Sequence, residues 1–124
     1  MTSERDRLVA SLDELDTAIA DAAAVLEASR VDNRRLRESI VRGDPLPKAL
    51  TAITVPEVMG DVAQALKKLE ETRHRNRTAV FAVGMSESVS IGELARLYGF
   101  SRQLAQRFAK EARGRCQLAG SEQF

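Results

Sequence analysis

A group of side chains that can hydrogen-bond to nucleic acids lies near the C-terminal end of the sequence. It comprises Arg102, Gln103, Gln106, Arg107 and Lys110. A guanidinium group can donate two hydrogen bonds to guanine O6 and N7, and a glutamine amide can pair with adenine N6 and N7. On one helix these side chains would point away from its apolar side, which is formed by Leu104, Ala105, Phe108 and Ala112. A helix buried on all sides would not need this polar group, so the pattern favours an exposed recognition face.

A helix over residues 90–98 is expected to precede this face. The Ser90 hydroxyl can accept a hydrogen bond from the Glu93 amide, and the Glu93 carboxylate can reach back to the Ser90 amide. Val89 and Leu94 occupy the two positions of a hydrophobic staple around this capping box. The inward side of the helix is expected to carry Ile91, Leu94, Ala95 and either Leu97 or Tyr98.

A tight turn is expected between this helix and the next. Gly99 ends the first helix, because glycine adopts the left-handed backbone conformation that such a turn needs. Phe100 is expected to be buried and Ser101 to cap the second helix, which should end at Gly114. The two helices would then form one compact motif, with the polar face on the second.

The run from Ile91 to Phe108 resembles a bacterial helix-turn-helix of the homeodomain-like type, as in resolvases, transposases and the promoter-reading regions of sigma factors. Ala95 supplies the small residue where the helices cross, and Gly99 stands in the turn four positions later. Ala105 departs from the pattern, since a larger Val or Ile is usual there. The resemblance covers only this C-terminal part of the chain.

The resemblance implies double-stranded DNA as a partner, with the second helix in the major groove. The residues expected to contact base edges are Arg102, Gln103, Gln106 and Arg107, of which the last could instead hold a phosphate. The residues expected to contact phosphates are Arg96, Ser101, Lys110, Arg113 and Arg115. Two interpretations stay open for a preceding basic group, either backbone contacts or a solvated face: Arg73, Arg75 and Arg77.

Residues 3–42 contain no proline or glycine and are expected to form one long helix. Alternating steps of four and three give a mainly apolar seam at Leu8, Leu12, Leu15, Ile19, Ala22, Leu26, Ser29, Asn33, Leu36 and Ile40. Such a helix would be roughly 60 Å long and would need a partner helix to cover its seam. Asn33 either fixes the register of that pairing or faces solvent beyond its end.

Residues 43–47 should end this helix, because glycine and two prolines follow one another there. A short helical turn over 48–53 and a second long helix over 56–83 are expected next, before a loop at 84–88. The second helix repeats the rhythm at Met59, Val62, Leu66, Leu69, Arg73, Asn76, Val80 and Val83. Whether the two helices pair within one chain or between two chains stays open.

Charge and composition exclude several classes of protein. The formal net charge is only +1, but residues 1–30 carry seven acidic and three basic side chains, and residues 91–124 carry three acidic and six basic ones. One histidine, His74, and one cysteine, Cys116, leave no metal or cofactor site and no catalytic arrangement, so no enzyme activity is expected. No signal peptide or membrane span is expected, which favours a cytoplasmic protein at the nucleoid.

These observations predict an all-α protein, in which a long helical hairpin or coiled-coil arm precedes a C-terminal helix-turn-helix. The expected parts are a dimerisation arm over residues 1–83, a DNA-binding module over 84–116 and a flexible tail over 117–124. The expected function is sequence-specific DNA binding by a homodimeric regulator of bacterial or phage type, paired through its N-terminal helices. The alternative is a coiled-coil adaptor or nucleoid-associated protein, whose acidic arm binds a protein partner.

Overall fold

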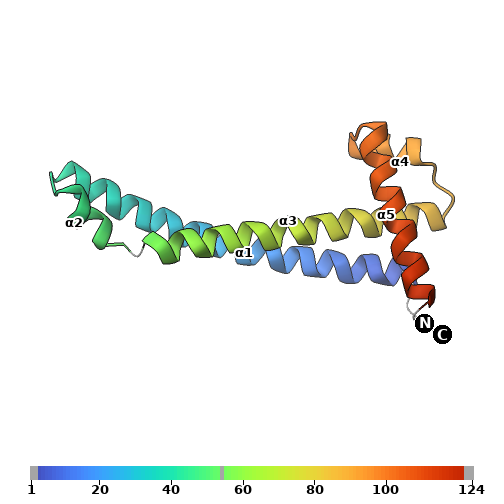
Figure 1. Ribbon diagram of the computed structural model, residues 1–124, viewed down its shortest axis with the longest axis horizontal. Coiled ribbons are helices and arrows are strands. Elements are labelled where there is room, and N and C mark those ends of the chain that lie inside the picture. Colours follow the sequence, from blue (N-terminus) through green and yellow to red (C-terminus); the bar gives the residue numbers. More distant parts are fainter. Residues whose placement is uncertain (1–2, 54, 122–124) are drawn as a thin grey trace. The chain divides into compact units, whose positions relative to one another are not determined.

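The computed structural model describes residues 3–53 and 55–121, without the side chains of residues 55, 56, 58 and 115–121. Its helices, shown in Figure 1, are α1 (Glu4–Val41), α2 (Leu46–Thr51), α3 (Val55–Ser86), α4 (Ile91–Tyr98) and α5 (Arg102–Ser121). The described ranges contain no β-strand. The predicted all-α class is therefore confirmed. None of the helices, within those ranges, has an apolar stretch long enough to cross a membrane.

The chain divides into two units. The middle unit consists of residues 16–71, and the C-terminal unit combines residues 1–15 with residues 72–124. Both α1 and α3 pass from one unit into the other, because the unit boundaries fall inside these helices.

In the middle unit, α1 and α3 run antiparallel and pack along one seam per helix (Figure 1). The seam residues of α1 follow each other in steps of three and four and are at least half-buried: Ala18, Ala22, Val25, Ser29, Asp32, Leu36 and Ser39. Those of α3 are Val62, Ala65 and Leu69. In this structure the two helices pair within one chain.

Part of the predicted seam of α1 is wrong. Ala22, Ser29 and Leu36 do lie on the observed seam, but the alternate predicted positions face solvent: Ile19, Leu26, Asn33 and Ile40. The residue one step before each of these points inward instead. Several of the inward residues are small, as at Ala18 and Ser39, so α3 can approach the α1 backbone closely there.

The break after α1 lies where the sequence predicts it. Gly43 has a φ of 88°, the left-handed conformation that ends a helix. The Ser39 hydroxyl donates a hydrogen bond of 2.7 Å to the Asp44 carboxylate. This bond is the main reason that the pKa of Asp44 lies below its usual value. The short α2 follows and is anchored by Ala49, which is fully buried.

The core of the C-terminal unit lies where the end of α3 meets α4 and α5. Its buried members are Phe81, Leu94, Ala95, Ala105, Phe108, Ala109 and Ala112, and Leu104 and Phe100 pack against them. The Phe81 ring stacks on those of Phe108 and Phe100, with centroid distances of 5.5 and 6.4 Å. Ala105 is fully buried in this cluster, of which Phe108 is also a member and against which Leu104 packs. Phe100, which was expected to be buried, is only half-buried.

Two glycines predicted to mark helix ends lie inside helices instead. Residues 84–86, expected in a loop, continue α3, and α5 continues through Gly114 to Ser121 rather than ending there. Gly84 allows close packing, because a Cβ at this position would lie 2.8 Å from a methyl carbon of Leu94. Gly114 has open space around it and no positive φ, so it only lowers helix propensity and does not end the helix.

Candidate nucleic-acid interface

Three local signals hold α4 and α5 in place. The Ser90 hydroxyl accepts a hydrogen bond of 3.1 Å from the Glu93 amide, and the Ser101 hydroxyl accepts one of 3.1 Å from the Leu104 amide. Gly99, between the helices, has a φ of 70°, as its predicted role in the turn requires. Both predicted caps and the turn glycine are therefore confirmed.

The second half of the expected capping box is absent among the described contacts. The Glu93 carboxylate accepts a hydrogen bond of 2.5 Å from Arg96 Nη2 instead of one from the Ser90 amide. This ion pair raises the pKa of Arg96 and lowers that of Glu93. Arg96 therefore has a carboxylate partner that a phosphate would have to replace, whereas Arg102, Arg107 and Arg113 have none among the described residues.

The polar residues of α5 share one exposed face. Arg102, Gln103, Gln106, Arg107, Lys110 and Arg113 are all exposed. Successive residues of an α-helix are rotated by about 100°, so these six fall within an arc of about 140°. In the part of the chain that the structure describes, no acidic side chain forms an ion pair with Arg102, Arg107, Lys110 or Arg113.

The remaining two predicted phosphate contacts differ from these. Ser101 is exposed at the start of α5, but its hydroxyl oxygen already accepts the capping hydrogen bond. The side chain of Arg115 lies outside the described residues. The structure therefore brings six of the predicted residues, Arg113 among them, onto one face of α5. Arg96 lies on α4 and Ser101 in the turn before α5.

The opposite face of α5 is fixed to α3. The His74 Nε2 atom lies 2.6 Å from the Glu111 carboxylate, and the His74 ring lies 5.0 Å from that of Phe108. No sequence pattern predicts this link, because 37 residues separate the two partners and neither belongs to a local motif. The contact fixes the direction in which the polar face of α5 points.

Two residues of the basic group on α3 already have partners. The Arg77 guanidinium lies over the Phe100 ring at 5.3 Å, and Arg75 lies 3.9 Å from a Glu14 carboxylate oxygen. Arg73 also has an interaction within the chain. These contacts hold the group within the C-terminal unit, a role that neither of the two interpretations included.

The aromatic residue of α4, Tyr98, contacts the rings at the edge of the core. The Tyr98 ring lies 5.1 Å from the Phe100 ring, and partial burial raises the pKa of its hydroxyl. Leu97, the other candidate for the inward position, is 64% exposed. Tyr98 is therefore the residue of the pair that faces inward.

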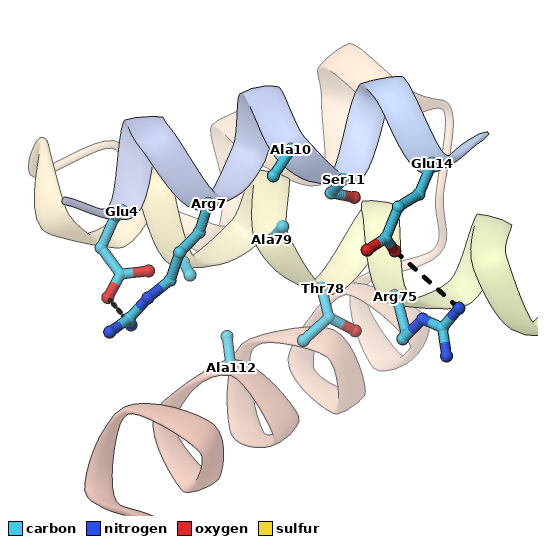
Figure 2. A pocket seen from close by; sticks show the side chains of 10 residues that line it. Glu4, Arg7, Ala10, Ser11, Glu14, Arg75, Thr78, Ala79 and Ala112 are labelled. Carbon is cyan, nitrogen blue, oxygen red and sulfur yellow. Dashed lines mark hydrogen bonds and ion pairs between the residues drawn. The ribbon is translucent and has the colours of Figure 1, made fainter. Parts of the chain in front are cut away.

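A hollow of about 250 Å³ lies on the other side of this unit, between α1, α3 and α5 (Figure 2). Alanines form much of its wall, including Ala10, Ala79 and Ala112. The two arginines at its edge are each paired: Arg7 Nη1 lies 3.0 Å from Glu4, and Arg75 pairs with Glu14. Because both cations are already neutralised, the hollow is a weaker candidate for binding a charged ligand than the open face of α5.

Within the described residues, no group of three or more His, Cys, Asp or Glu side chains could hold a metal ion. No protein-family model, curated protein or solved structure matches the chain.

Proposed function

We propose that this chain binds double-stranded DNA sequence-specifically through α5, as a homodimeric transcription regulator. The observation that carries the proposal is the exposed face of α5. The cations on this face have no ion-pair partner among the described residues, and two glutamines lie between them. A surface helix in a structural role gains little from leaving several cations unpaired on one face, whereas a DNA-binding helix needs them free.

The residues of this face divide into two roles by their chemistry. Arg102, Gln103 and Gln106 lie in the first turns of α5 and can read base edges through paired hydrogen bonds. Lys110 and Arg113 lie one to three turns further on, where phosphate contacts would fix the register of the helix. Arg107 stands between the two groups and can serve either role.

The rest of the C-terminal unit supports this use of α5. Helix α4 and the end of α3 pack against its apolar side through Leu94 and Phe81, and the Gly99 turn separates α4 from α5. This arrangement is compatible with a helix-turn-helix that has a third supporting helix. It leaves the polar face of α5 free to enter a groove.

The proposal is tested by fluorescence anisotropy on a labelled mixed-sequence duplex, across a salt series that starts at about 50 mM. We expect binding that weakens steeply with salt. The Arg102→Ala/Arg107→Ala variant should bind at least tenfold more weakly, because a well-placed arginine contributes about 1–3 kcal/mol. Each lost phosphate contact should also lower the slope of log affinity against log salt by about 0.9.

The matched control is Lys48→Ala/Lys67→Ala, which removes the same charge from exposed positions of α2 and α3 in the middle unit. It should bind as the unaltered chain does. Equal losses in both variants would mean that net charge alone drives binding, and would overturn the assignment to α5. Absence of binding at the lowest salt would instead favour the adaptor, whose partner is a protein.

A further inference from the structure

The middle unit carries a second apolar row that its own seam does not cover. We call it the outer row: Ile19, Leu26, Asn33 and Ile40 on α1, with Met59 and Leu66 on α3. Its apolar members are 42–68% exposed, from Leu26 at the lower end to Met59 at the upper. On each helix these residues repeat every seven positions. Those of α1 directly follow a seam residue, as Leu66 of α3 follows Ala65, and Met59 lies seven positions before Leu66.

The two halves of the outer row lie on the same flank of the hairpin. A hollow of about 190 Å³ is lined by Asn33 from α1 and Met59 from α3, beside the seam residues Ser29 and Asp32. A second hollow beside the same two seam residues is lined by Ala28 and Asp61 instead. The seam is therefore bordered by the outer row on one flank and by Ala28 and Asp61 on the other.

This pattern is typical of a helix with more than one helical neighbour. A seam alone needs two apolar positions in each heptad, and a third adjacent position marks a helix that packs into a larger bundle. The internal seam of the middle unit buries mostly small side chains, such as Ala18, Ala22 and Ser39. The larger side chains Ile19, Leu26 and Met59 remain outside, so the outer row offers apolar surface for further packing.

The charges of α1 indicate what covers this row. Residues 16–27 carry Asp16, Asp21 and Glu27 without a basic side chain, for a net charge of −3. Residues 28–42 carry five arginines against Asp32 and Glu38, for a net charge of +3. A second α1 laid antiparallel on the first would place each acidic half beside a basic half, whereas a parallel α1 would place like charges together.

We propose that the outer row is the interface with a second copy of this chain, with the two α1 helices stacked antiparallel. A two-fold axis makes such a contact self-complementary, because the same row is offered by both copies. The product is a four-helix bundle made of two hairpins, each burying the outer row of the other. The inference specifies the dimer of the proposed function but does not depend on DNA binding.

The oligomeric state is measured on the full chain by light scattering after size-exclusion chromatography, over a wide range of concentrations. We expect the mass of a dimer for the unaltered chain. Ile19→Glu/Leu26→Glu should weaken the dimer by about a hundredfold or more, because it places four charges in one apolar interface. The matched control is Ala20→Glu/Ala24→Glu, which adds the same charge at exposed positions outside the outer row and should leave the dimer intact. Circular dichroism verifies that each variant keeps its helices.

The direction of packing is measured by distances between spin labels in a Cys116→Ser background. Labels at Arg30→Cys lie near the centre of the antiparallel pair and should be close together. Labels at Asp16→Cys should be about 40 Å apart, since each lies roughly 13 residues from that centre. Equal short distances at both positions would overturn the antiparallel arrangement.

A monomeric mass for the unaltered chain at all concentrations would overturn the proposal and assign the row to a different protein. This failure is distinguishable from failure of the proposed function. The Arg102→Ala/Arg107→Ala variant should remain a dimer while it loses DNA, and the Ile19→Glu/Leu26→Glu variant should lose the dimer while each chain keeps its α5 face.

Discussion

Replacement of Gly84 by alanine tests how closely α3 and α4 pack, and hence how the face of α5 is supported. The new Cβ would lie 2.8 and 2.9 Å from the two Leu94 methyl carbons and 3.3 Å from Cγ. Leu94 has little freedom to move away, because it is only 5% exposed and belongs to the core with Phe81 and Phe108. The substitution therefore overpacks the junction between the two helices.

Two opposing effects determine the size of the change. Overpacking of a core position costs about 1–3 kcal/mol. Exchanging glycine for alanine inside a helix contributes about 0.8–1.0 kcal/mol in the other direction. The expected net effect is a destabilisation of about 1 kcal/mol, which lowers the melting temperature by about 4 °C in a chain of this size.

Thermal unfolding followed by circular dichroism, at one fixed protein concentration, measures this effect. Gly60→Ala is the matched control, because Gly60 lies in the same helix with nothing within 4 Å of its added Cβ. In Gly60→Ala only the higher helix propensity of alanine should act, so this variant should be more stable and melt at a higher temperature. Stabilisation of equal size in Gly84→Ala would refute the close packing of α3 against α4.

The double variant with Leu94→Ala gives a sharper check. Leu94→Ala alone should cost about 2–5 kcal/mol, because it empties a core position. Once the Leu94 methyl groups are gone, the added Cβ at residue 84 has nothing to strike. Gly84→Ala should then stabilise the chain in this background, and a loss of stability there as well would contradict the assigned cause.

Two further predictions concern local backbone and ionisation. Gly99→Ala should cost about 1–2 kcal/mol in unfolding experiments, because alanine strains a φ of 70°, and Gly99→Asn should cost less since asparagine tolerates this region. Ser39→Ala should raise the pKa of Asp44 towards its usual value in a carboxyl NMR titration. The pKa of Asp44 is lower in the folded chain than in the unfolded chain. Its contribution to the free energy of unfolding is therefore fully present above the unfolded-state pKa, and it is lost as the pH falls through the folded-state pKa. An unchanged Asp44 titration would show that Lys48 and Arg42, rather than the hydroxyl, hold the pKa down.

The signals that the sequence analysis interpreted correctly are short in range. The Ser90 and Ser101 caps, the Gly99 turn and the Gly43 break each depend on residues within four positions of one another. Their geometry is set by local hydrogen bonds and allowed backbone angles, so residue type and spacing suffice to identify them.

The features that sequence analysis missed are determined by packing over long distances. The predicted and the observed seam of α1 have every seventh residue in common, as at Ala22, and differ in the residues between. Only contact with α3 decides that Ala18 rather than Ile19 turns inward. In the same way, glycine is typical of helix ends, but Gly84 lies inside α3. Only the closeness of Leu94 explains why a glycine stands there. The His74–Glu111 link across 37 residues leaves no local pattern at all.

Small residues connect the packing of the C-terminal unit to the direction of its polar face. Ala105, Ala109 and Ala112 line the buried side of α5 and are each at most 1% exposed, so the helix lies against its neighbours with almost no side chain between them. An enlarged side chain at any of these positions would have to displace α5 as a whole, because the aromatic rings behind it are already stacked. Arg102 and Arg107 sit on the same helix and would move with it. Recognition of base edges requires hydrogen-bond distances and angles to be kept within narrow limits. The proposed DNA binding should therefore depend as much on these three buried alanines as on the exposed arginines of α5.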